Sequence, residues 1–279
     1  MTESVKITNL IENTEGAAGC IAAHGLCFYV ETPGHRLLSD LGPSADTLTN
    51  AAHLGIDLTQ VDTVILSHGH YDHSGGILPF AALNPKASIY MQESAAGGYY
   101  AYDGPEKGMR YIGIDPAIAE LPQVIRVRGD LTIDDELSLL TVGKRIRPVP
   151  STNRSLMMKR DERYVQDDFA HEQMLVVSAG GKHILLSGCA HNGILNILSA
   201  YEAKYGCDPD IVISGFHLMK HAEYTPDERR EIEEIAQELL KHPTLFYTCH
   251  CTGVPAYEQM KEIMGDRLQY VHSGEEIRC

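Results

Sequence analysis

The sequence predicts an α/β fold in which mixed sheets carry helices on their outer faces. In the first half of the chain, short β-like runs follow one another closely, which is typical of hairpins. In the second half, strands alternate with amphipathic helices, as in parallel sheets. The chain has 279 residues, is 43% hydrophobic and shows no low-complexity linker or internal repeat. We therefore expect one large domain over residues 1–279.

The first half contributes most of one sheet. We expect strands at residues 27–31, 36–41, 61–67 and 87–92, with helices at residues 47–54 and directly after Gly76.

The segment at residues 94–165 is the least regular part of the chain. It combines several prolines with Tyr99, Tyr100, Tyr102 and Tyr111. A long irregular segment inside a compact domain often covers a site, so we interpret it as an insertion and a candidate lid. Ordinary packing explains its tyrosines equally well.

The pattern is clearer after residue 173. A Gly-Gly turn joins two apolar runs, which indicates a hairpin. Thr225-Pro226-Asp227-Glu228 has the capping-box pattern with proline at the first helical position, which marks a helix start. We expect strands at residues 174–178, 183–187, 211–214 and 245–248, with helices at residues 193–205, 225–241 and 254–264.

The most informative segment, residues 68–73, reads His-Gly-His-Tyr-Asp-His at the end of the third expected strand. A strand that ends in a tight loop can aim His68 and His70 at one point. The same loop can aim Asp72 and His73 at a neighbouring point, as two adjacent divalent ions require. Imidazoles with one carboxylate suit zinc, iron or manganese better than calcium or magnesium. A solvated His-rich loop is the simpler interpretation, but small residues and an apolar stretch follow directly.

Three further histidines each end an expected strand, where loops project from a rigid scaffold. His191 precedes a helix, so a metal ligand and anion-binding helix amides would be adjacent; a capping or surface histidine is the alternative. At His250, flanked by Cys249 and Cys251, neighbouring side chains point opposite ways, so either the histidine or the two cysteines face inward. We prefer His250. For His217, metal ligand, substrate contact and packed histidine all remain open.

Composition excludes several function classes. The net charge of −15 argues against nucleic acid as a partner, because phosphate backbones require a basic footprint. No window approaches the roughly 18 apolar residues of a membrane span, and the first six residues lack a signal-peptide core. Seven cysteines without disulfide-framework spacing suit a reducing compartment, so we expect a cytoplasmic protein. Basic side chains within residues 144–160 either guide a small anion or form a solvated strip.

These motifs carry a family resemblance. Residues 68–76 match the HxHxDH signature of the metallo-β-lactamase superfamily, and residues 38–42 resemble the strand-turn that precedes it. Within that superfamily, the chain resembles a narrower group related to dihydropterin methyltransferase and ribofuranosylaminobenzene 5′-phosphate synthase. The segments that carry the narrower resemblance are Ala23-His24-Gly25-Leu26 and residues 188–193, 215–218 and 250–253.

The resemblance implies a four-layer αββα sandwich with two mixed sheets, outer helices and a dinuclear metal site at one edge. The implied ligands are His68, His70 and His191 for the first ion, and Asp72, His73 and His250 for the second. Most of the superfamily has Gly-Asp, a bridging carboxylate, where this chain has Gly188-Cys189. A thiolate could bridge, but the Gly-Cys-x-His pattern favours a shift of the ligand to His191. We expect one or two divalent ions, zinc first, with iron or manganese as alternatives.

The implied activity is metal-dependent hydrolysis by a metal-activated hydroxide. Asp72 would orient or deprotonate the water if one ion is present. His24 and His217 would protonate the leaving group or hold a substrate phosphate. Asn192 and Thr252, at the helix starts after His191 and His250, are expected to bind the substrate. The expected partner is a small, phosphorylated or otherwise acidic molecule, without nucleic acid or membrane; the sequence leaves the oligomeric state open.

Two other functions compete with hydrolysis. The first is group transfer to a pterin or aminobenzoate-type acceptor stacked on Tyr99, Tyr100 or Tyr111, as the narrower group suggests. The second is a di-iron redox or non-catalytic metal-binding protein. It is disfavoured because di-iron relatives usually have a carboxylate at the second histidine of the signature, whereas His70 is retained.

Overall fold

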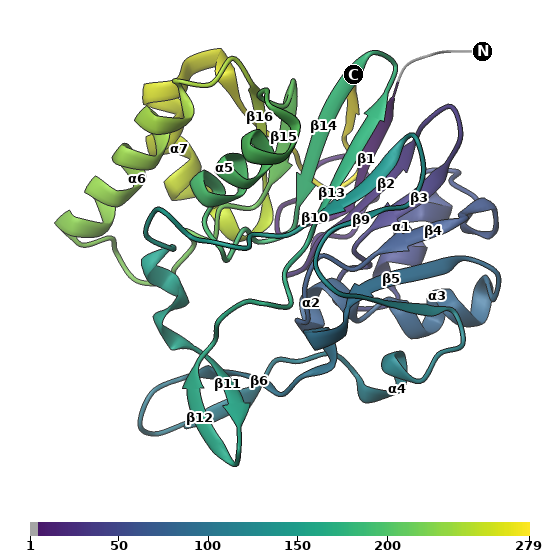
Figure 1. The fold of residues 1–279 in the computed structure, drawn as a ribbon, viewed down its shortest axis with the longest axis horizontal. Helices are drawn as coiled ribbons and strands as arrows, with labels where there is room; N and C mark the ends of the chain where they lie inside the picture. Colours follow the sequence, from purple (N-terminus) through teal and green to yellow (C-terminus); the bar gives the residue numbers. More distant parts are fainter. Residues whose placement is uncertain (1–4) are drawn as a thin grey trace.

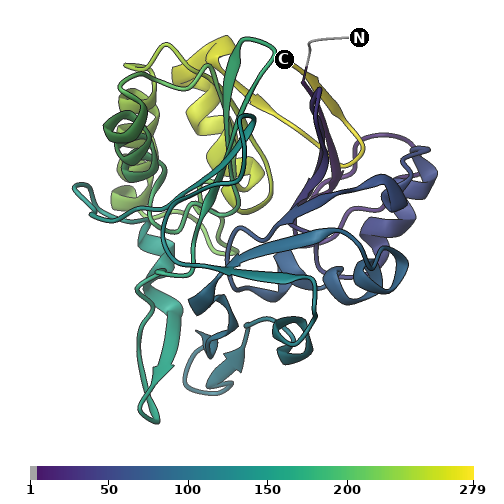
Figure 2. The ribbon, with the colours of Figure 1, turned by 45° about the vertical axis from the view of Figure 1, so that its right-hand side comes forward.

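The computed structural model describes residues 5–279 and arranges them in four layers. Two seven-stranded sheets face each other, and helices cover the outer face of each (Figures 1 and 2). The four-layer αββα sandwich expected from the sequence is therefore confirmed.

The first sheet is mixed. In spatial order its strands are β18 (Glu276–Arg278), β1 (Lys6–Ile11), β2 (Cys27–Glu31), β3 (Arg36–Ser39), β4 (Thr63–Ile65), β5 (Ser88–Gln92) and β8 (Val124–Val127). Neighbours from β18 to β3 are antiparallel, and neighbours from β3 to β8 are parallel. The last strand of the chain thus pairs with the first one.

The second sheet repeats this division. In spatial order its strands are β17 (Leu268–Tyr270), β16 (Leu245–Thr248), β15 (Ile211–Ser214), β14 (Lys182–Ser187), β13 (Met174–Ala179), β10 (Leu137–Leu140) and β9 (Leu131–Thr132). Pairs from β17 to β14 are parallel, and pairs from β14 to β9 are antiparallel. The expected hairpin of residues 174–187 is the β13–β14 pair.

A third, four-stranded sheet extends from one end of the sandwich (Figure 1). Its order is β12 (Arg163–Gln166), β11 (Leu156–Arg160), β6 (Tyr99–Tyr102) and β7 (Met109–Tyr111). The segment at residues 94–165 is thus more regular than its sequence indicates, because it also supplies β8, β9 and β10 to the two main sheets. We call the four-stranded unit the small sheet.

The helices lie outside the sheets. They are α1 (Asp46–His53), α2 (Tyr71–Ser74), α3 (Ile77–Leu83), α4 (Pro116–Ala119), α5 (Ile194–Tyr205), α6 (Pro226–Leu239) and α7 (Val254–Met264), with short 3-10 turns η1 (Leu58–Gln60), η2 (Glu93–Ala96), η3 (Ser151–Ser155), η4 (His250–Thr252) and η5 (Gly265–Arg267). Helix α6 begins with the predicted capping box between Thr225 and Glu228. None of the helices within residues 5–279 is long and apolar enough to cross a membrane.

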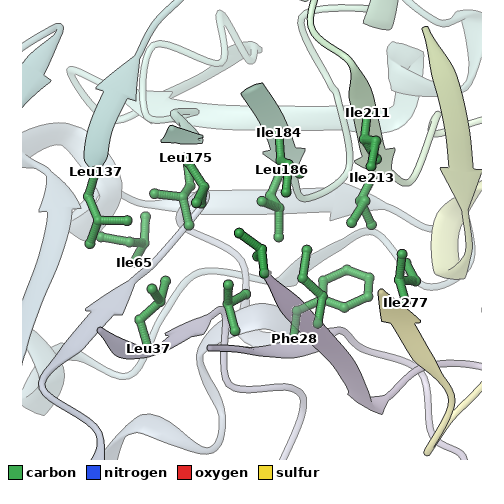
Figure 3. Close-up of a cluster of buried hydrophobic side chains, with 14 of the residues drawn as sticks. Phe28, Leu37, Ile65, Leu137, Leu175, Ile184, Leu186, Ile211, Ile213 and Ile277 are labelled. Carbon is green, nitrogen blue, oxygen red and sulfur yellow. The ribbon is translucent and has the colours of Figure 1, made fainter. Parts of the chain in front are cut away.

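Three apolar cores hold the layers together. The central core lies between the sheets, where Phe28, Leu37 and Ile65 face Leu175 and Leu186 (Figure 3). A second core packs α5, α6 and α7 against the second sheet, and a third packs α1, α3 and α4 against the first. Removal of this apolar surface from water, worth about 25 cal/mol per Å², is the main force that holds the layers together.

Candidate metal centre

Loops that follow four strands build the site. His68 to Asp72 follow β4, and Cys189, His217 and His250 follow β14, β15 and β16 respectively. Left-handed backbone occurs at non-glycine residues in these loops, with φ of 52° at Ala190, 50° at His217 and 49° at His250. Such backbone costs energy and persists where the surrounding contacts enforce it, which is common at functional sites.

The first donor cluster consists of His68, His70 and His191. All three are buried, and one nitrogen of each lies within 4.8 Å of the others. The Nε2 atoms of His68 and His191 are 3.3 Å apart. The structure therefore brings together the three side chains that the sequence assigns to the first ion.

The second donor cluster consists of Asp72, His73, Cys189 and His250. Asp72 Oδ2 lies 3.6 Å from His73 Nε2 and 3.3 Å from His250 Nε2. Cys189 Sγ lies 3.3 Å from His73 Nε2. The three ligands expected for the second ion converge here, and a thiol that the sequence analysis did not select joins them.

Hydrogen bonds fix the tautomer of four of the five candidate ligand imidazoles in the same sense. Asn153 Oδ1 lies 2.9 Å from His191 Nδ1, and Asn13 Oδ1 lies 2.7 Å from His250 Nδ1. Because an amide oxygen only accepts, both Nδ1 atoms carry the proton and both Nε2 lone pairs are free. Partners of this kind orient metal ligands.

Asp40 organises the other two imidazoles. Its Oδ2 accepts from His73 Nδ1 at 2.7 Å and from the Ser67 hydroxyl at 2.7 Å. Since the single hydroxyl proton of Ser67 is used there, Ser67 Oγ accepts from His68 Nδ1 at 2.9 Å. His68 Nε2 therefore also faces the first cluster as a lone pair, and His73 Nε2 offers one to the second cluster when the His73 imidazole is neutral.

Two observations show that these residues fit divalent ions. The Nε2 atoms of His70 and His250 are buried without a hydrogen-bond partner of good geometry, which is costly unless another group satisfies them. Burial also lowers the pKa of His70 to about 3 and that of His250 to about 4. Both imidazoles are thus neutral at pH 7, the form that binds metal.

His73 differs from the other ligands when no ion is bound. Burial alone would lower its pKa, but the carboxylates of Asp40 and Asp72 outweigh burial and raise the pKa to about 9. In the metal-free protein a proton therefore occupies the side chain between the two carboxylates. A bound ion must displace that proton.

Two glycines allow the loops to approach each other. A Cβ atom at Gly69, between the first two ligands, would lie 2.3 Å from the carbonyl oxygen of Ala95. A Cβ atom at Gly188 would lie 2.2 Å from Ser67 Oγ. The chain at the ends of β4 and β14 can therefore come this close only with glycine at these positions.

Internal carboxylates bind the backbone amides of the loops that lead into helices α5 and α7. Glu172 accepts hydrogen bonds from the amide nitrogens of His191 at 2.6 Å and Asn192 at 2.8 Å, and from Asn192 Nδ2 at 2.8 Å. Glu12 likewise accepts from the amide of His250 at 2.9 Å. These amides beside the donor clusters are therefore not available to a substrate anion.

Asn192 and Thr252 accordingly lie away from the pocket over the donor clusters. Arg145 donates to Asn192 Oδ1 at 2.7 Å, and Asn192 Nδ2 is held by Glu172. Thr252 Oγ accepts from the amide of Phe216 at 2.8 Å and contacts Thr248 Oγ at 2.5 Å. Both side chains are buried in internal contacts, and the structure gives no support for a substrate-binding role.

His24 and His217 both line that pocket, as a direct role requires. His24 is half exposed, with its Nε2 3.6 Å from Asp72 Oδ2. The Thr152 hydroxyl donates to the carbonyl oxygen of His217, so it accepts from His217 Nδ1 at 2.9 Å. Burial lowers the pKa of His217 to about 3. His217 is therefore neutral with a free Nε2 lone pair, which suits a hydrogen-bond acceptor better than a proton donor.

Sequence reasoning missed a buried segment that supports the metal ligands. His171 Nδ1 accepts from the amide of Gly69 at 2.9 Å, and its Nε2 donates to Asp167 at 3.1 Å. The backbone amide of Gln173 donates to the carbonyl oxygen of Ser67 at 2.7 Å, and its side-chain Nε2 donates to the carbonyl oxygen of Leu66 at 2.9 Å. The usable signal was a dense polar run, residues 167–173, directly before an apolar strand.

The tyrosines considered for acceptor stacking pack elsewhere. Tyr99 is buried 4.0 Å from the ring of His171, and its hydroxyl donates to the carbonyl oxygen of Ser94. Tyr100 contacts the rings of Tyr111 and Tyr164. Among the described side chains, the pocket lining includes none of the three candidate tyrosines.

Comparison with known proteins gives consistent results. The sequence profile of the metallo-β-lactamase superfamily matches residues 22–222. An uncharacterised protein of Methanocaldococcus jannaschii is 26% identical over 96% of this chain and 98% of its own length. From the same organism, 7,8-dihydropterin-6-methyl-4-(β-D-ribofuranosyl)-aminobenzene-5′-phosphate synthase is 25% identical over 99% of this chain and 97% of its own. The crystal structure of Tm1679, described as a metal-dependent hydrolase of the β-lactamase superfamily, is 27% identical with a TM-score of 0.82, covering 98% of each chain.

Proposed function

The chain belongs to the metallo-β-lactamase superfamily, and from this we propose that it is a metal-dependent hydrolase of a small anionic substrate. The observation that carries the proposal is the pair of adjacent donor clusters, in which the buried Nε2 atoms of His70 and His250 have no hydrogen-bond partner of good geometry. Tm1679, which shares nearly the whole fold, is described as a metal-dependent hydrolase, which supports the reaction class.

His68, His70 and His191 would hold one ion, and Asp72, His73, His250 and Cys189 the other; imidazole and thiolate donors make zinc the first candidate. When bound, such ions lower the pKa of water towards 7 and polarise the bond under attack.

The chain's own groups would manage the proton and the leaving group. Asp72 Oδ2 lies within 3.6 Å of His24 Nε2, so Asp72 can orient that imidazole at the pocket mouth. Because His24 is half exposed, it can exchange protons with solvent and supply one to a leaving group. The neutral His217 would accept a hydrogen bond from the substrate at Nε2.

The net charge supports a small-molecule partner, and the free cysteines support a reducing compartment. With a net charge of −15, a small molecule is a better partner than nucleic acid. All seven cysteines lie within the described residues and are unpaired, which suits a reducing compartment such as the cytoplasm.

The test combines metal analysis with turnover. Protein prepared without added zinc should contain one or two equivalents of a transition metal. It should hydrolyse at least one member of a panel of phosphomonoesters, phosphodiesters, pyrophosphates and lactones. His70→Ala should lose metal and turnover together, whereas His183→Ala, an exposed histidine on β14, should keep both. Full activity in His70→Ala would reject the proposal.

Group transfer is the second candidate, favoured by one observation. The relative named as a pterin-related synthase aligns over nearly the whole chain. Turnover of the panel compounds with and without a dihydropterin acceptor separates the two reactions. A product that joins the acceptor to the donor fragment would establish transfer, and an unchanged product would establish hydrolysis.

A further inference from the structure

We infer that Arg110, carried by the small sheet, recognises an anionic group on the substrate at a distance from the reacting bond. The ligand is then a small molecule with an apolar body and a remote carboxylate or phosphate. This inference rests on the proposed function, because the reacting bond is placed at the donor clusters.

The pocket over the donor clusters is built by two different walls. One wall carries the metal-ligand side chains together with His24 and His217. The small sheet and the residue after β7 supply the other wall, with Ala101, Ile112 and Leu156 as apolar surface and Arg110 as its cation. The cavity of about 160 Å³ limits the occupant to a small molecule. A ligand that fills it must contact both walls.

The guanidinium of Arg110 is held in place before any ligand arrives. Asp103 accepts from Arg110 Nε at 2.7 Å and from Nη2 at 3.3 Å. The side chain is half exposed, and these bonds use one edge of the guanidinium, while Tyr71, which also lines the pocket, is a second hydrogen-bonding neighbour of Arg110. Because a guanidinium has five N–H donors, donors remain for a ligand. Since Asp103 offsets the charge, the contribution of Arg110 is a directed, charge-assisted hydrogen bond and not long-range attraction.

The small sheet is fixed relative to the metal ligands. The amide of Tyr71, between His70 and Asp72, donates to the carbonyl oxygen of Ile112 at 2.9 Å. Ile112 lies two residues after Arg110, so the position of the guanidinium is tied to the ligand loop. This connection gives the remote anion a defined spacing from the reacting bond.

The other groups that could bind a substrate anion are backbone amides and basic side chains, and these lie outside the pocket or already have partners. Glu172 and Glu12 bond the backbone amides of the loops before α5 and α7, and the first residues of these two helices do not line the pocket. None of the six basic residues within 144–160 lines the pocket, and four of them have partners elsewhere: Arg145 with Asn192, Arg147 with Glu238, Lys159 with Glu162 and Arg160 with Asp168. Within the described residues, Arg110 is the one lysine or arginine that lines the pocket.

Paired thiol probes test the inference in the zinc-loaded protein. Benzyl mercaptan offers a thiol for the metal and an apolar ring, and 3- and 4-(mercaptomethyl)benzoate add a remote carboxylate. By titration calorimetry, we expect at least one carboxylate probe to bind the native protein about tenfold more tightly than benzyl mercaptan. Arg110→Gln should abolish that preference without changing the affinity for benzyl mercaptan. Arg110→Lys should keep part of it, because the charge remains but the planar fork is lost.

The control is Arg163→Gln, which removes an exposed arginine from β12, at the opposite edge of the same small sheet. It should keep the full preference. The inference is overturned if the native protein binds all three thiols equally, or if Arg110→Gln keeps the preference, while the proposed function survives both results. If none of the thiols binds the zinc-loaded protein, the metal assignment fails first and this inference fails with it.

Discussion

Cys189 occupies the position where most of the superfamily carries a bridging aspartate, and its thiol lies with the second donor cluster. Burial raises the pKa of Cys189 well above its usual range in the metal-free protein. A thiolate therefore forms there only when an ion replaces the proton. The structure thus reconciles two sequence alternatives, because His191 joins the first cluster while Cys189 stands at the second.

Cobalt substitution tests the role of Cys189. We expect the cobalt-loaded protein to show a near-ultraviolet sulfur-to-cobalt charge-transfer band, because a thiolate ligand donates charge to the ion. Cys189→Ser should remove the band, and Cys207→Ser, which alters an exposed thiol, should keep it. A band that survives in Cys189→Ser would show that this thiol is not a ligand.

Glu172 supports the loop of the first cluster through three hydrogen bonds. Its carboxylate is buried, accepts three N–H donors from two residues, and has a raised pKa because of that burial. Glu172→Gln presents an amide group to at least one of these donors. We expect a loss of about 1–3 kcal/mol in the free energy of unfolding, the usual cost of an unsatisfied buried group. Urea unfolding measures it.

The same variant should weaken zinc binding, since the Glu172 hydrogen bonds position His191. The matched control is Glu262→Gln, which alters an exposed carboxylate on α7. It should leave the free energy of unfolding and the zinc affinity unchanged. Equal stability of Glu172→Gln and the native protein would mean that the loop does not depend on the carboxylate.

The sequence could predict which side chains form the two donor clusters because each lies in a recognisable motif or directly after a strand. Residues 68–73 fall in one loop, and His191 and His250 each end a clear strand. Asn13, Asn153 and Glu172 could not be found in the same way. They lie 237, 38 and 19 residues from the groups that they bind, and asparagine and glutamate are unremarkable in surface loops.

At the scale of elements, prediction succeeded where periodicity was strong. Helix α7 was predicted with its observed bounds, and α6 begins at its predicted capping box. Strand β1 was missed because Thr8 and Asn9 are buried polar residues in its middle, which hides the apolar pattern. Asn9 is buried because its side chain donates to the carbonyl oxygen of Val271.

His35 connects elements of the two main sheets. Its Nδ1 lies 2.9 Å from Asp62, just before β4, and its Nε2 lies 2.8 Å from Asp134, between β9 and β10. Burial alone would lower the pKa of His35, but the two carboxylates outweigh burial and raise it. Because the folded-state pKa of His35 is raised, the contacts of its protonated imidazole with the two carboxylates stabilise the protein fully below the unfolded-state pKa of 6.5. That stabilisation is lost as pH rises through the folded-state pKa.

We therefore expect His35→Gln to cost about 1 kcal/mol of unfolding free energy near pH 5.5 and clearly less near pH 9. Urea unfolding at the two pH values measures the difference. His221→Gln, in an exposed loop, serves as the control and should show no such pH dependence. A cost that is constant or grows with pH would contradict the link.

At the scale of the whole molecule, the donor clusters join the two halves of the sandwich. His68 to His73 follow a strand of the first sheet, whereas Cys189, His191 and His250 follow strands of the second. The family resemblance predicted this convergence, because no strand order was worked out from the sequence. The small sheet was not predictable, because β12 is fully exposed and β7 largely so, and such strands lack an apolar face.

Because both halves supply ligands, bound ions should act as cross-links that raise stability. An ion that binds only the folded state at about 100 times its dissociation constant contributes about 2.7 kcal/mol. For a chain of this size, that corresponds to a shift of roughly 5–10 °C in the midpoint of thermal unfolding. We expect a chelator to lower the midpoint by this amount and returned zinc to restore it, as measured by calorimetry.

A variant with His68 and His250 both replaced by alanine loses a donor from each cluster and should not respond to the chelator. An unchanged midpoint in the native protein after complete metal removal, verified by elemental analysis, would show that the two sheets hold together without help from the ions.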